Sequence, residues 1–506
     1  MSIKFSFGKT PKSKSETVVI FTYGNKTLGA SGKDIDKQSK GHIQNALKTA
    51  SNFEGKSGQS TVIAMPKGSD FERVIVLGAG EAKKSTVLEI ENLGANVLGT
   101  LKSVGAKHVS VIVDSVKGLG IKPEEFAAAF VTGIRLRSYG FHVYKKPESK
   151  NSLVQIDCVL DKQTAAKKLF TYEDAVAQGV YLARDVMNEP PNKLYPESYA
   201  KRLQKELKPL GVDVEILNEA QMKKMKFHSH LEVGKGSDRK SCVVIMRWHG
   251  APVTKAKKTF SKTPIAFVGK GITFDTGGIS IKPSAGMDAM KMDMGGSAAV
   301  VGLMKAIAAR KSKANVVGIV ALAENMPSAR AYRPGDIINS MSGKTIQVDN
   351  TDAEGRLVLN DSLTYVQRTY KPKFVIDLAT LTGAMMVALG HEYCGAFVNN
   401  DGLWSKLESS SQKTGEKLWR MPLDEAYRKA MEGKFSDLNN VGTMGRFGGA
   451  CTAAGFLEHF IEDDTPWAHL DIAGKMEQKS DKGVTTAGGV GFGVRVLDRL
   501  ISDHYE

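Results

Sequence analysis

Cysteines and long apolar runs are both scarce in this sequence of 506 residues. The four cysteines (158, 242, 394 and 451) form no Cys-x-x-Cys pair, as is typical of free thiols in a reducing compartment. No stretch approaches the roughly 18 uncharged apolar residues of a membrane-spanning helix. The first residues lack the long apolar run of a secretory signal. We therefore expect a cytoplasmic protein with no membrane partner.

Two familiar catalytic motifs are also absent. No His-Glu-x-x-His occurs, and none of the ten histidines lies between His249 and His391, which excludes a single-zinc protease of that type. Residues 29–33 come near a phosphate-binding loop but have the wrong spacing. We interpret His469 as a core residue and His228 and His230 as surface residues.

Acidic residues are fewer than basic ones. The chain has 70 Lys and Arg against 54 Asp and Glu, a net charge of +16. Residues 1–170 alone contribute +11 of this excess, by 26 against 15. Such charge would attract nucleic acid, but the lysines are scattered, and neither a helix-turn-helix nor an aromatic-interleaved basic strip is present. We interpret the excess as a solvated lysine-rich surface, with nucleic-acid binding as the alternative.

The pattern of apolar runs predicts an α/β fold in two parts. Hydrophobic residues make up 42 % and charged residues 25 % of the chain, as in soluble globular proteins. We expect a smaller N-terminal α/β domain over residues 1–168, a connecting helix over 169–190, and a larger α/β domain over 191–506 with a central, mainly parallel sheet. Ser297 is expected to cap a helix, and residues 228–262, including the lysines at 255–258, to form an exposed insertion or loop.

Residues 350–357 read Asn-Thr-Asp-Ala-Glu-Gly-Arg-Leu. In an extended segment, Asp352, Glu354 and Arg356 would all point to one side. Two buried carboxylates need a cation to neutralise them. A divalent metal would do so, whereas a surface loop with local ion pairs is the simpler alternative for this segment taken alone.

A second charged cluster lies upstream, in residues 268–296, directly after the apolar run 264–268. Lys270, Asp275, Lys282 and Asp293 stand among glycines and apolar residues there. Burial of such groups requires pairing or a metal, and the glycines permit close backbone approach and positive φ. A glycine-rich turn with Lys–Asp pairs is the alternative.

Together these segments resemble the leucyl aminopeptidase family, the dinuclear-metal M17 peptidases. Residues 350–357 are the signature octapeptide of that family, and the resemblance extends through residues 183–192, 268–293, 377–384 and 467–474. It covers about residues 180–500 closely, and the first 170 only in length and general pattern. The resemblance implies an aminopeptidase hydrolase that forms a homohexamer.

The resemblance also implies a ligand set of two divalent ions per subunit, zinc or manganese, with magnesium or cobalt as further occupants of an exchangeable site. One ion would be held by Lys270, Asp275, Asp293 and Glu354. The other would be held by Asp275, Asp352 and Glu354. A lysine ligand must lose its proton, which burial beside a dication favours.

The implied mechanism is attack on the scissile carbonyl by a water that bridges the two metals. Lys282 would stabilise the developing oxyanion, and a bicarbonate on Arg356 would move the proton. The side-chain pocket would prefer leucine and other apolar residues. Its predicted lining residues are Met290, Thr380, Gly383, Ala473 and Met476, and Leu381 is predicted to contact the substrate through its backbone.

Two other functions compete with this hypothesis. A different dinuclear hydrolase, such as a phosphatase or amidohydrolase, could use the same acids, but it would have no reason to combine them with Lys282, Arg356 and a Met-lined pocket. A nucleic-acid-binding protein with secondary peptidase activity would explain the basic charge. The complete ligand set favours the aminopeptidase acting on peptides.

Overall fold

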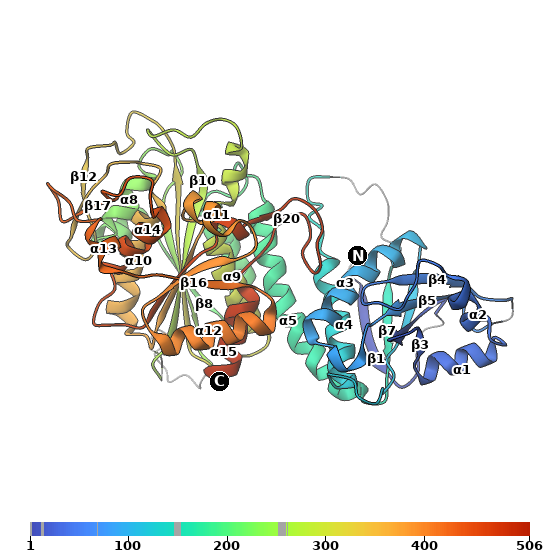
Figure 1. Ribbon diagram of the computed structural model, residues 1–506. Coiled ribbons are helices and arrows are strands. Elements are labelled where there is room, and N and C mark those ends of the chain that lie inside the picture. The colour runs from blue at the N-terminus through green and yellow to red at the C-terminus, as the bar shows by residue number, and fades with distance from the viewer. Residues whose placement is uncertain (1–2, 12–14, 68, 146–152, 251–259, 261) are drawn as a thin grey trace. The chain divides into compact units, whose positions relative to one another are not determined.

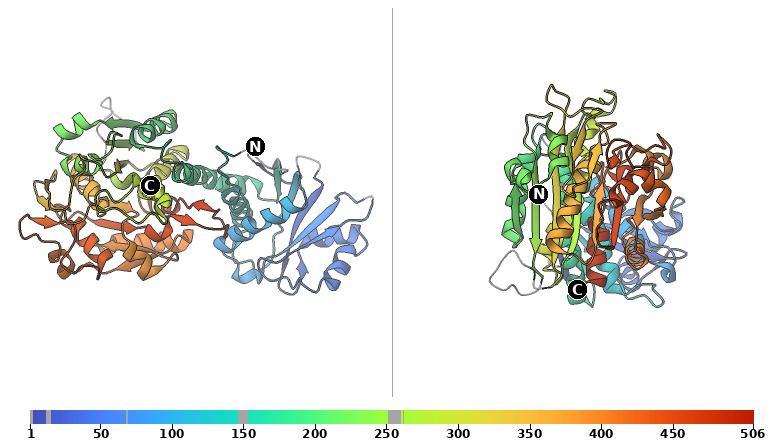
Figure 2. Two further views of the ribbon diagram at one scale, coloured as in Figure 1. Left: turned by 90° about the horizontal axis from the view of Figure 1, so that it is seen from above. Right: turned by 90° about the vertical axis from the view of Figure 1, so that its left-hand side faces the viewer.

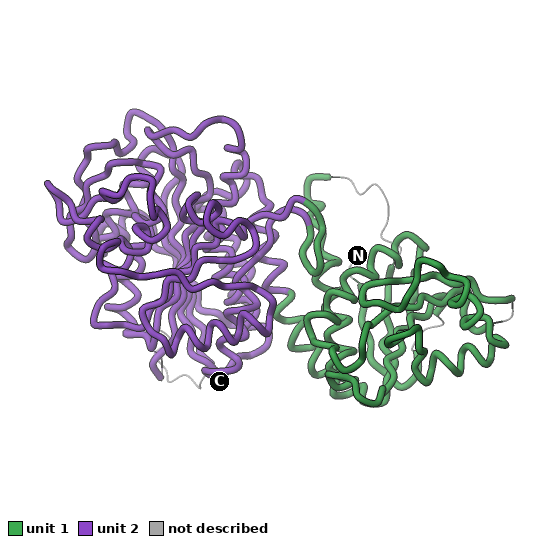
Figure 3. Tube along the Cα trace, in the orientation of Figure 1, with its two compact units in different colours: residues 1–177, 480–486 green, residues 178–479, 487–506 purple. Residues whose placement is uncertain are grey.

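A computed structural model describes residues 3–11, 15–67, 69–145, 153–250, 260 and 262–506. They form two compact units (Figure 3): unit 1 comprises residues 1–177 and 480–486, and unit 2 comprises residues 178–479 and 487–506. Both units are α/β, as predicted. The lysines at 255–258 lie outside the described residues.

Unit 1 is built on a mostly parallel sheet (Figure 1). Its strands run in the order β1-β7-β6-β2-β5-β4, with β3 paired to β2. Only β3 and β4 pair antiparallel with their neighbours in this sheet. The strands are β1 Lys4–Gly8, β2 Thr17–Tyr23, β3 Thr27–Leu28, β4 Ser60–Ala64, β5 Arg73–Gly78, β6 His108–Ile112 and β7 Gln155–Val159.

Helices cover both faces of this sheet, which explains why β2 is buried at every position. Val19 and Phe21 of β2 belong to one buried cluster with α3 and α4, whereas Val18 and Ile20 belong to another with α1 and α2. The alternation follows from the period of two along a strand. The helices are α1 Ala30–Gln38, α2 His42–Thr49, α3 Val87–Ser103 and α4 Pro123–Arg137.

The sheet of unit 2 is mixed, with a parallel centre. Its order is β16-β15-β18-β14-β10-β11-β9-β8, and the run β18-β14-β10-β11 is parallel. The strands are β8 Asp213–Leu217, β9 Cys242–Trp248, β10 Ile265–Asp275, β11 Val316–Asn325, β14 Val375–Ala379, β15 Cys394–Val398, β16 Leu418–Met421 and β18 Trp467–Asp471. Smaller sheets are formed by β12 Ile337–Asn339, β13 Thr345–Gln347 and β17 Leu438–Asn439, and by β19 Glu477–Gln478 and β20 Gly488–Gly489.

Helices flank the large sheet on both sides (Figure 2). Ala266 and Val268 of β10 pack in one buried cluster with Leu357 of α10, and α9 also packs against β10. The helices are α5 Gln163–Asn188, which contains the boundary between the units, α6 Pro196–Leu207, α7 Glu219–Lys224, α8 His228–Gly234, α9 Gly295–Ala309, α10 Gly355–Tyr370, α11 Gly383–Leu389, α12 Asp401–Thr414, α13 Glu425–Lys429, α14 Gly449–Glu458 and α15 Val494–His504.

Three local predictions were wrong. Ser297 does not cap α9, because the helix begins at Gly295 and the Ser297 hydroxyl donates to Met294 O at 2.7 Å. Residues 228–250 are no exposed loop, because they contain α8 and the buried strand β9. His230 is fully buried on α8, with its Nε2 at 3.1 Å from Leu322 O.

One helical stretch of the described residues, Met287–Ala309, is long and apolar enough to cross a membrane by length and composition. Its apolar window is 89 % buried inside the protein. That burial is what a core helix shows, and α9, which forms most of the stretch, packs against β10, β11 and β14.

Candidate metal centre

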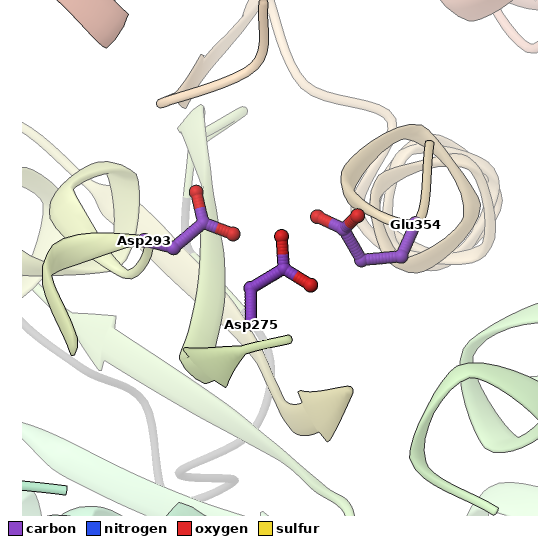
Figure 4. A group of neighbouring side chains, drawn as sticks. All are labelled: Asp275, Asp293 and Glu354. Carbon is purple, nitrogen blue, oxygen red and sulfur yellow. The ribbon is translucent and has the colours of Figure 1, made fainter. Parts of the chain in front are cut away.

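Three carboxylates from separate parts of unit 2 meet at one point (Figure 4). Asp275 is the last residue of β10, Asp293 directly follows the short 3-10 helix η3 (Met287–Met292), and Glu354 directly precedes α10. One oxygen from each lies within 4.8 Å of the others. All three side chains are buried, so their mutual repulsion must be offset by positive charge.

Lys270 supplies part of that charge from inside β10 rather than from a loop at its end. Its Nζ lies 2.8 Å from Asp293 Oδ2 and 2.7 Å from Glu354 Oε1. Burial alone would lower the pKa of Lys270, but these carboxylates outweigh it and hold that pKa above its usual value. Ligation of a metal would require this amine to lose its proton, which a nearby dication favours.

Lys282 lies on the other side of Asp275. Its Nζ is 2.9 Å from Asp275 Oδ2, and it also forms an ion pair with the half-buried Asp352. Burial works against the charge on Lys282, but the surrounding carboxylates raise its pKa overall. The structure thus brings together the predicted residues Lys270, Asp275, Lys282, Asp293, Asp352 and Glu354.

The acids show how strongly the site requires cations. Burial, reinforced by the neighbouring Asp275, raises the pKa of Glu354 to about 8. Burial likewise raises the pKa of Asp293 to about 6, against the lowering effect of Lys270. In the part of the chain that the structure describes, Glu354 Oε2 is buried without a hydrogen-bond partner. Buried oxygen donors at this spacing suit a divalent cation.

Glycines shape the backbone around these ligands. Gly277 and Gly278 have φ of 85° and 68°, so the chain turns sharply just after Asp275 in a conformation that favours glycine. At Gly355, an added Cβ would lie 2.8 Å from Lys270 Nζ. The lysine therefore reaches the acids by passing directly over the first residue of α10.

Arg356 is not part of an extended segment, as the alternation of residues 352–356 suggested, but lies in the first turn of α10. Its Nη1 donates to Asn440 O at 2.8 Å. Its Nε is buried without a hydrogen-bond partner among the described residues. Burial lowers the pKa of Arg356 to about 10, so the guanidinium remains charged at neutral pH.

The predicted pocket residues come from three places: the segment after β14, the segment after β18, and the 3-10 helix η3. Thr380 and Leu381 follow β14, Gly383 begins α11, Ala473 begins the 3-10 helix η4 (Ala473–Lys475), Met476 follows it, and Met290 lies on η3. Thr380 Oγ1 donates to Asp293 Oδ1 at 2.8 Å. Leu381 N and Ala473 N both donate to Asp471 Oδ1. Helix α11 packs against η4, so the two strand ends are close together.

Comparison with known proteins identifies the family. Residues 181–498 match the model of the cytosol aminopeptidase family, catalytic domain, and residues 18–148 match the N-terminal domain of the same family. The chain belongs to the cytosol aminopeptidase family. The resemblance inferred from five short blocks of sequence is confirmed, and so is the class of enzyme, an aminopeptidase hydrolase.

Relatives in this family match along nearly the whole chain. A probable cytosol aminopeptidase of Rhodopseudomonas palustris is 48 % identical, covering 97 % of this chain and 96 % of its own. Another, of Xanthobacter autotrophicus, is 44 % identical and covers 100 % and 99 %. These matches include the N-terminal region, where the sequence motifs gave only a general pattern.

Solved structures show the same fold. A mutant of tomato leucine aminopeptidase is 32 % identical, with a TM-score of 0.85 over 99 % of this chain and 96 % of its own. The bottromycin maturation enzyme BotP in complex with Mn is 28 % identical, with a TM-score of 0.83 over 96 % and 98 %. The manganese in that relative and the three clustered acids of this cytosol aminopeptidase family member are both consistent with divalent metal.

Sequence reasoning overlooked two buried asparagines that hold the signature segment. Asn325, at the end of β11, donates through Nδ2 to Asp275 Oδ1 at 2.8 Å and to Thr351 O at 3.0 Å. Asn440 accepts from Asp349 N at 2.8 Å and donates to Asn350 O at 2.6 Å. Nothing in a single sequence distinguishes them from other asparagines, because their partners are 26 to 91 residues away.

Proposed function

We propose that this enzyme is a leucyl aminopeptidase that removes N-terminal leucine and other apolar residues from peptides, with two divalent metal ions in a catalytic domain of residues 191–506. The observation that carries the proposal is the convergence of Asp275, Asp293 and Glu354, with ligand atoms within 4.8 Å of one another. Two cationic residues, Lys270 and Lys282, flank the acids.

The ligand assignment is the one that the family resemblance implies, and the proximity of these side chains supports it. Lys270, Asp275, Asp293 and Glu354 would hold one ion, and Asp275, Asp352 and Glu354 would hold the other. Asp275 and Glu354 belong to both of these ligand sets and would therefore serve both ions. Zinc and manganese suit such a donor set, with magnesium or cobalt in the more exchangeable position.

The bound ions would activate water as a nucleophile at neutral pH and polarise the scissile carbonyl. Lys282, which is 22 % exposed at the edge of the acid cluster, is placed to stabilise the oxyanion that develops on the substrate. Asp352, Asp275 and Glu354 hold that ammonium charged, since they raise its pKa.

Arg356 would bind a bicarbonate ion. Its unpartnered Nε and its charge make it a suitable anion site. No histidine contributes to this acid cluster among the described residues, since the ligand atoms all come from Asp, Glu and Lys. The bicarbonate would therefore provide the general base that the side chains lack.

The side-chain pocket would be formed by the residues around the ends of β14 and β18. Met290, Thr380, Gly383, Ala473 and Met476 combine a flexible apolar wall with small residues, which suits leucine and methionine side chains. Leu381 would contact the substrate through its backbone. We further expect a cytoplasmic homohexamer, with peptides rather than nucleic acid as its partners.

Hydrolysis of leucine p-nitroanilide tests the proposal. Activity of the purified enzyme should disappear with chelator and return with added zinc or manganese. Glu354→Ala should reduce kcat/KM by about a thousandfold or more and lower the bound metal. Lys282→Ala should lower kcat by about a hundredfold with metal content intact.

Two outcomes would refute the proposal. The first is an enzyme that cleaves neither leucine p-nitroanilide nor leucyl dipeptides with any of these metals. The second is full activity of the Glu354→Ala variant. A matched control is Asp361→Asn, which changes another buried acid on the same helix and should leave metal content unchanged.

A further inference from the structure

Asp471 is a buried carboxylate that does not belong to the candidate metal centre. It is the last residue of β18 and is 1 % exposed. Among the described residues, no lysine or arginine forms an ion pair with it. Its oxygens instead accept hydrogen bonds from neutral donors, and the buried Arg356 interacts with it electrostatically without a direct ion pair. Burial of a carboxylate is costly unless its oxygens are hydrogen-bonded.

All three of these donors belong to the two segments that line the proposed pocket. Oδ1 accepts from Leu381 N at 3.2 Å and from Ala473 N at 3.1 Å. Oδ2 accepts from the Thr382 hydroxyl at 2.6 Å. A single carboxylate therefore ties the segment after β14 to the segment after β18, and these bonds to an ionised acceptor are stronger than neutral ones.

The Thr380–Leu381 peptide is held from both sides. Its N–H points to Asp471, and its carbonyl, Thr380 O, accepts from Lys270 Nζ at 3.0 Å. In a trans peptide these two groups point in opposite directions, so Asp471 and Lys270 fix one peptide plane between them. The pocket wall is thereby oriented relative to the metal centre.

Thr382 extends the same arrangement into α11. Its hydroxyl donates to Asp471 and also accepts from Met385 N at 3.1 Å as the cap of that helix. The start of α11, including Gly383, is therefore fixed to the same carboxylate. Among the described residues, no other hydrogen-bonded side chain joins Leu381 to Ala473.

We propose that Asp471 is a positioning residue for specificity: it fixes the distance between the two pocket walls, and so the preference for a bulky apolar N-terminal residue over a small one. This inference rests on the proposed leucyl aminopeptidase function. A leucine side chain gains binding energy only from walls at the right separation, whereas an alanine side chain is too short to use them.

The test compares leucine and alanine p-nitroanilides as substrates of the metal-loaded full-length enzyme. Asp471→Asn should lower the leucine-to-alanine ratio of kcat/KM by about tenfold, mainly through a higher KM for leucine. Metal content, measured independently by elemental analysis, should be unchanged. A purely structural role would lower both substrates' kcat/KM together.

Asp377→Asn is the matched control. Asp377 lies on the adjacent strand β14 and is equally buried. It accepts from Trp467 Nε1 and pairs with His469 Nδ1, and no hydrogen bond among the described residues joins it to either pocket segment. This variant should lower stability and leave the leucine-to-alanine ratio within about twofold. An equal fall of the ratio in both variants would overturn the inference.

A second pair of variants decides the matter if Asp471→Asn does not fold. Thr382→Val removes one bond to Asp471 at similar volume and should lower the ratio by about threefold, whereas Thr382→Ser should not change it. Unchanged ratios in Asp471→Asn or Thr382→Val, with an active wild type, would refute the inference alone. A wild type that cleaves neither substrate would refute the proposed function and the inference together.

Discussion

At Gly355, an added side chain would collide with Lys270 of the metal centre but would not strain the backbone. An added Cβ would lie 2.8 Å from Cδ, Cε and Nζ of Lys270. The backbone of Gly355 is helical and is not at positive φ, so alanine is acceptable to the main chain. The conflict lies with the flexible end of Lys270, and moving it away would break its buried ion pairs with Asp293 and Glu354.

Gly355→Ala should therefore disturb the site rather than the backbone. We expect kcat/KM to fall by about tenfold or more because Lys270 is displaced from Asp293 and Glu354, and the free energy of unfolding to fall by about 3 kcal/mol because two buried carboxylates lose their cation. Urea unfolding and leucine p-nitroanilide hydrolysis measure the two effects. Gly99→Ala is the control, because an added Cβ meets nothing within 4 Å there.

The residues that sequence reasoning could find are those whose chemistry is exceptional. Asp275, Asp293 and Glu354 stand out because acids among glycines and apolar residues must be neutralised. Lys270 stood out only as a buried charge, and its place as a ligand came from the resemblance. Asn325 and Asn440 are ordinary residues in sequence, and only folding brings them to Asp275 and Asn350.

At the scale of elements, the contact between α8 and α10 contains two buried titratable groups whose pKa values are shifted in opposite directions. Asp361 of α10 accepts from His230 N at 3.1 Å and from Met341 N at 2.7 Å. Burial raises the pKa of Asp361 to about 7, and burial lowers the pKa of His230 to about 4. Both groups therefore prefer to be neutral in the folded protein.

These shifts act on stability in opposite directions as pH falls from 7 to 5. The stability that His230 contributes is fully present above its unfolded pKa of 6.5 and is lost as pH falls toward about 4. The stability that Asp361 contributes is fully present below its unfolded pKa of 3.8 and is lost as pH rises through about 7. Each change amounts to about 2 kcal/mol over this range, so in the wild type they nearly cancel.

A variant that lacks one of the two groups should show the pH dependence of stability that the other group causes. Relative to the wild type, His230→Gln should gain stability as pH falls from 7 to 5, and Asp361→Asn should lose it. Urea unfolding at several pH values, followed by tryptophan fluorescence, measures both slopes. Parallel slopes for wild type and both variants would show that neither group titrates in this window.

The fold class was easier to predict from sequence than the conformation of the short segments that carry the site. The pattern of apolar runs predicted a two-part α/β fold, which the structure confirms in both units. In contrast, the spacing of Asp352, Glu354 and Arg356 suggested an extended segment, but α10 begins at Gly355. The helix α10 is buried on all sides from Gly355 to Gln367 and packs in the core of unit 2, and neither fact is visible in eight residues.

At the scale of the whole molecule, each unit has hydrophobic clusters of its own, and the candidate metal centre belongs entirely to unit 2. The chain also provides a reporter for each unit. Trp248, Trp404, Trp419 and Trp467, the four tryptophans of the chain, all lie in unit 2. Cys158, which is buried, is the one cysteine within residues 1–177.

Metal removal should therefore destabilise the two units unequally. An ion that binds only the folded state stabilises it by about 2.7 kcal/mol at a hundred times its dissociation constant, so chelation should lower the midpoint of the tryptophan fluorescence transition by several degrees. The midpoint temperature for labelling of Cys158, measured by mass spectrometry, should not change. The reason is that the cluster around that thiol contains none of the proposed metal ligands. Added zinc or manganese should restore the first transition. Equal shifts of the two midpoints would contradict the prediction. They would mean that the two units unfold in one cooperative transition.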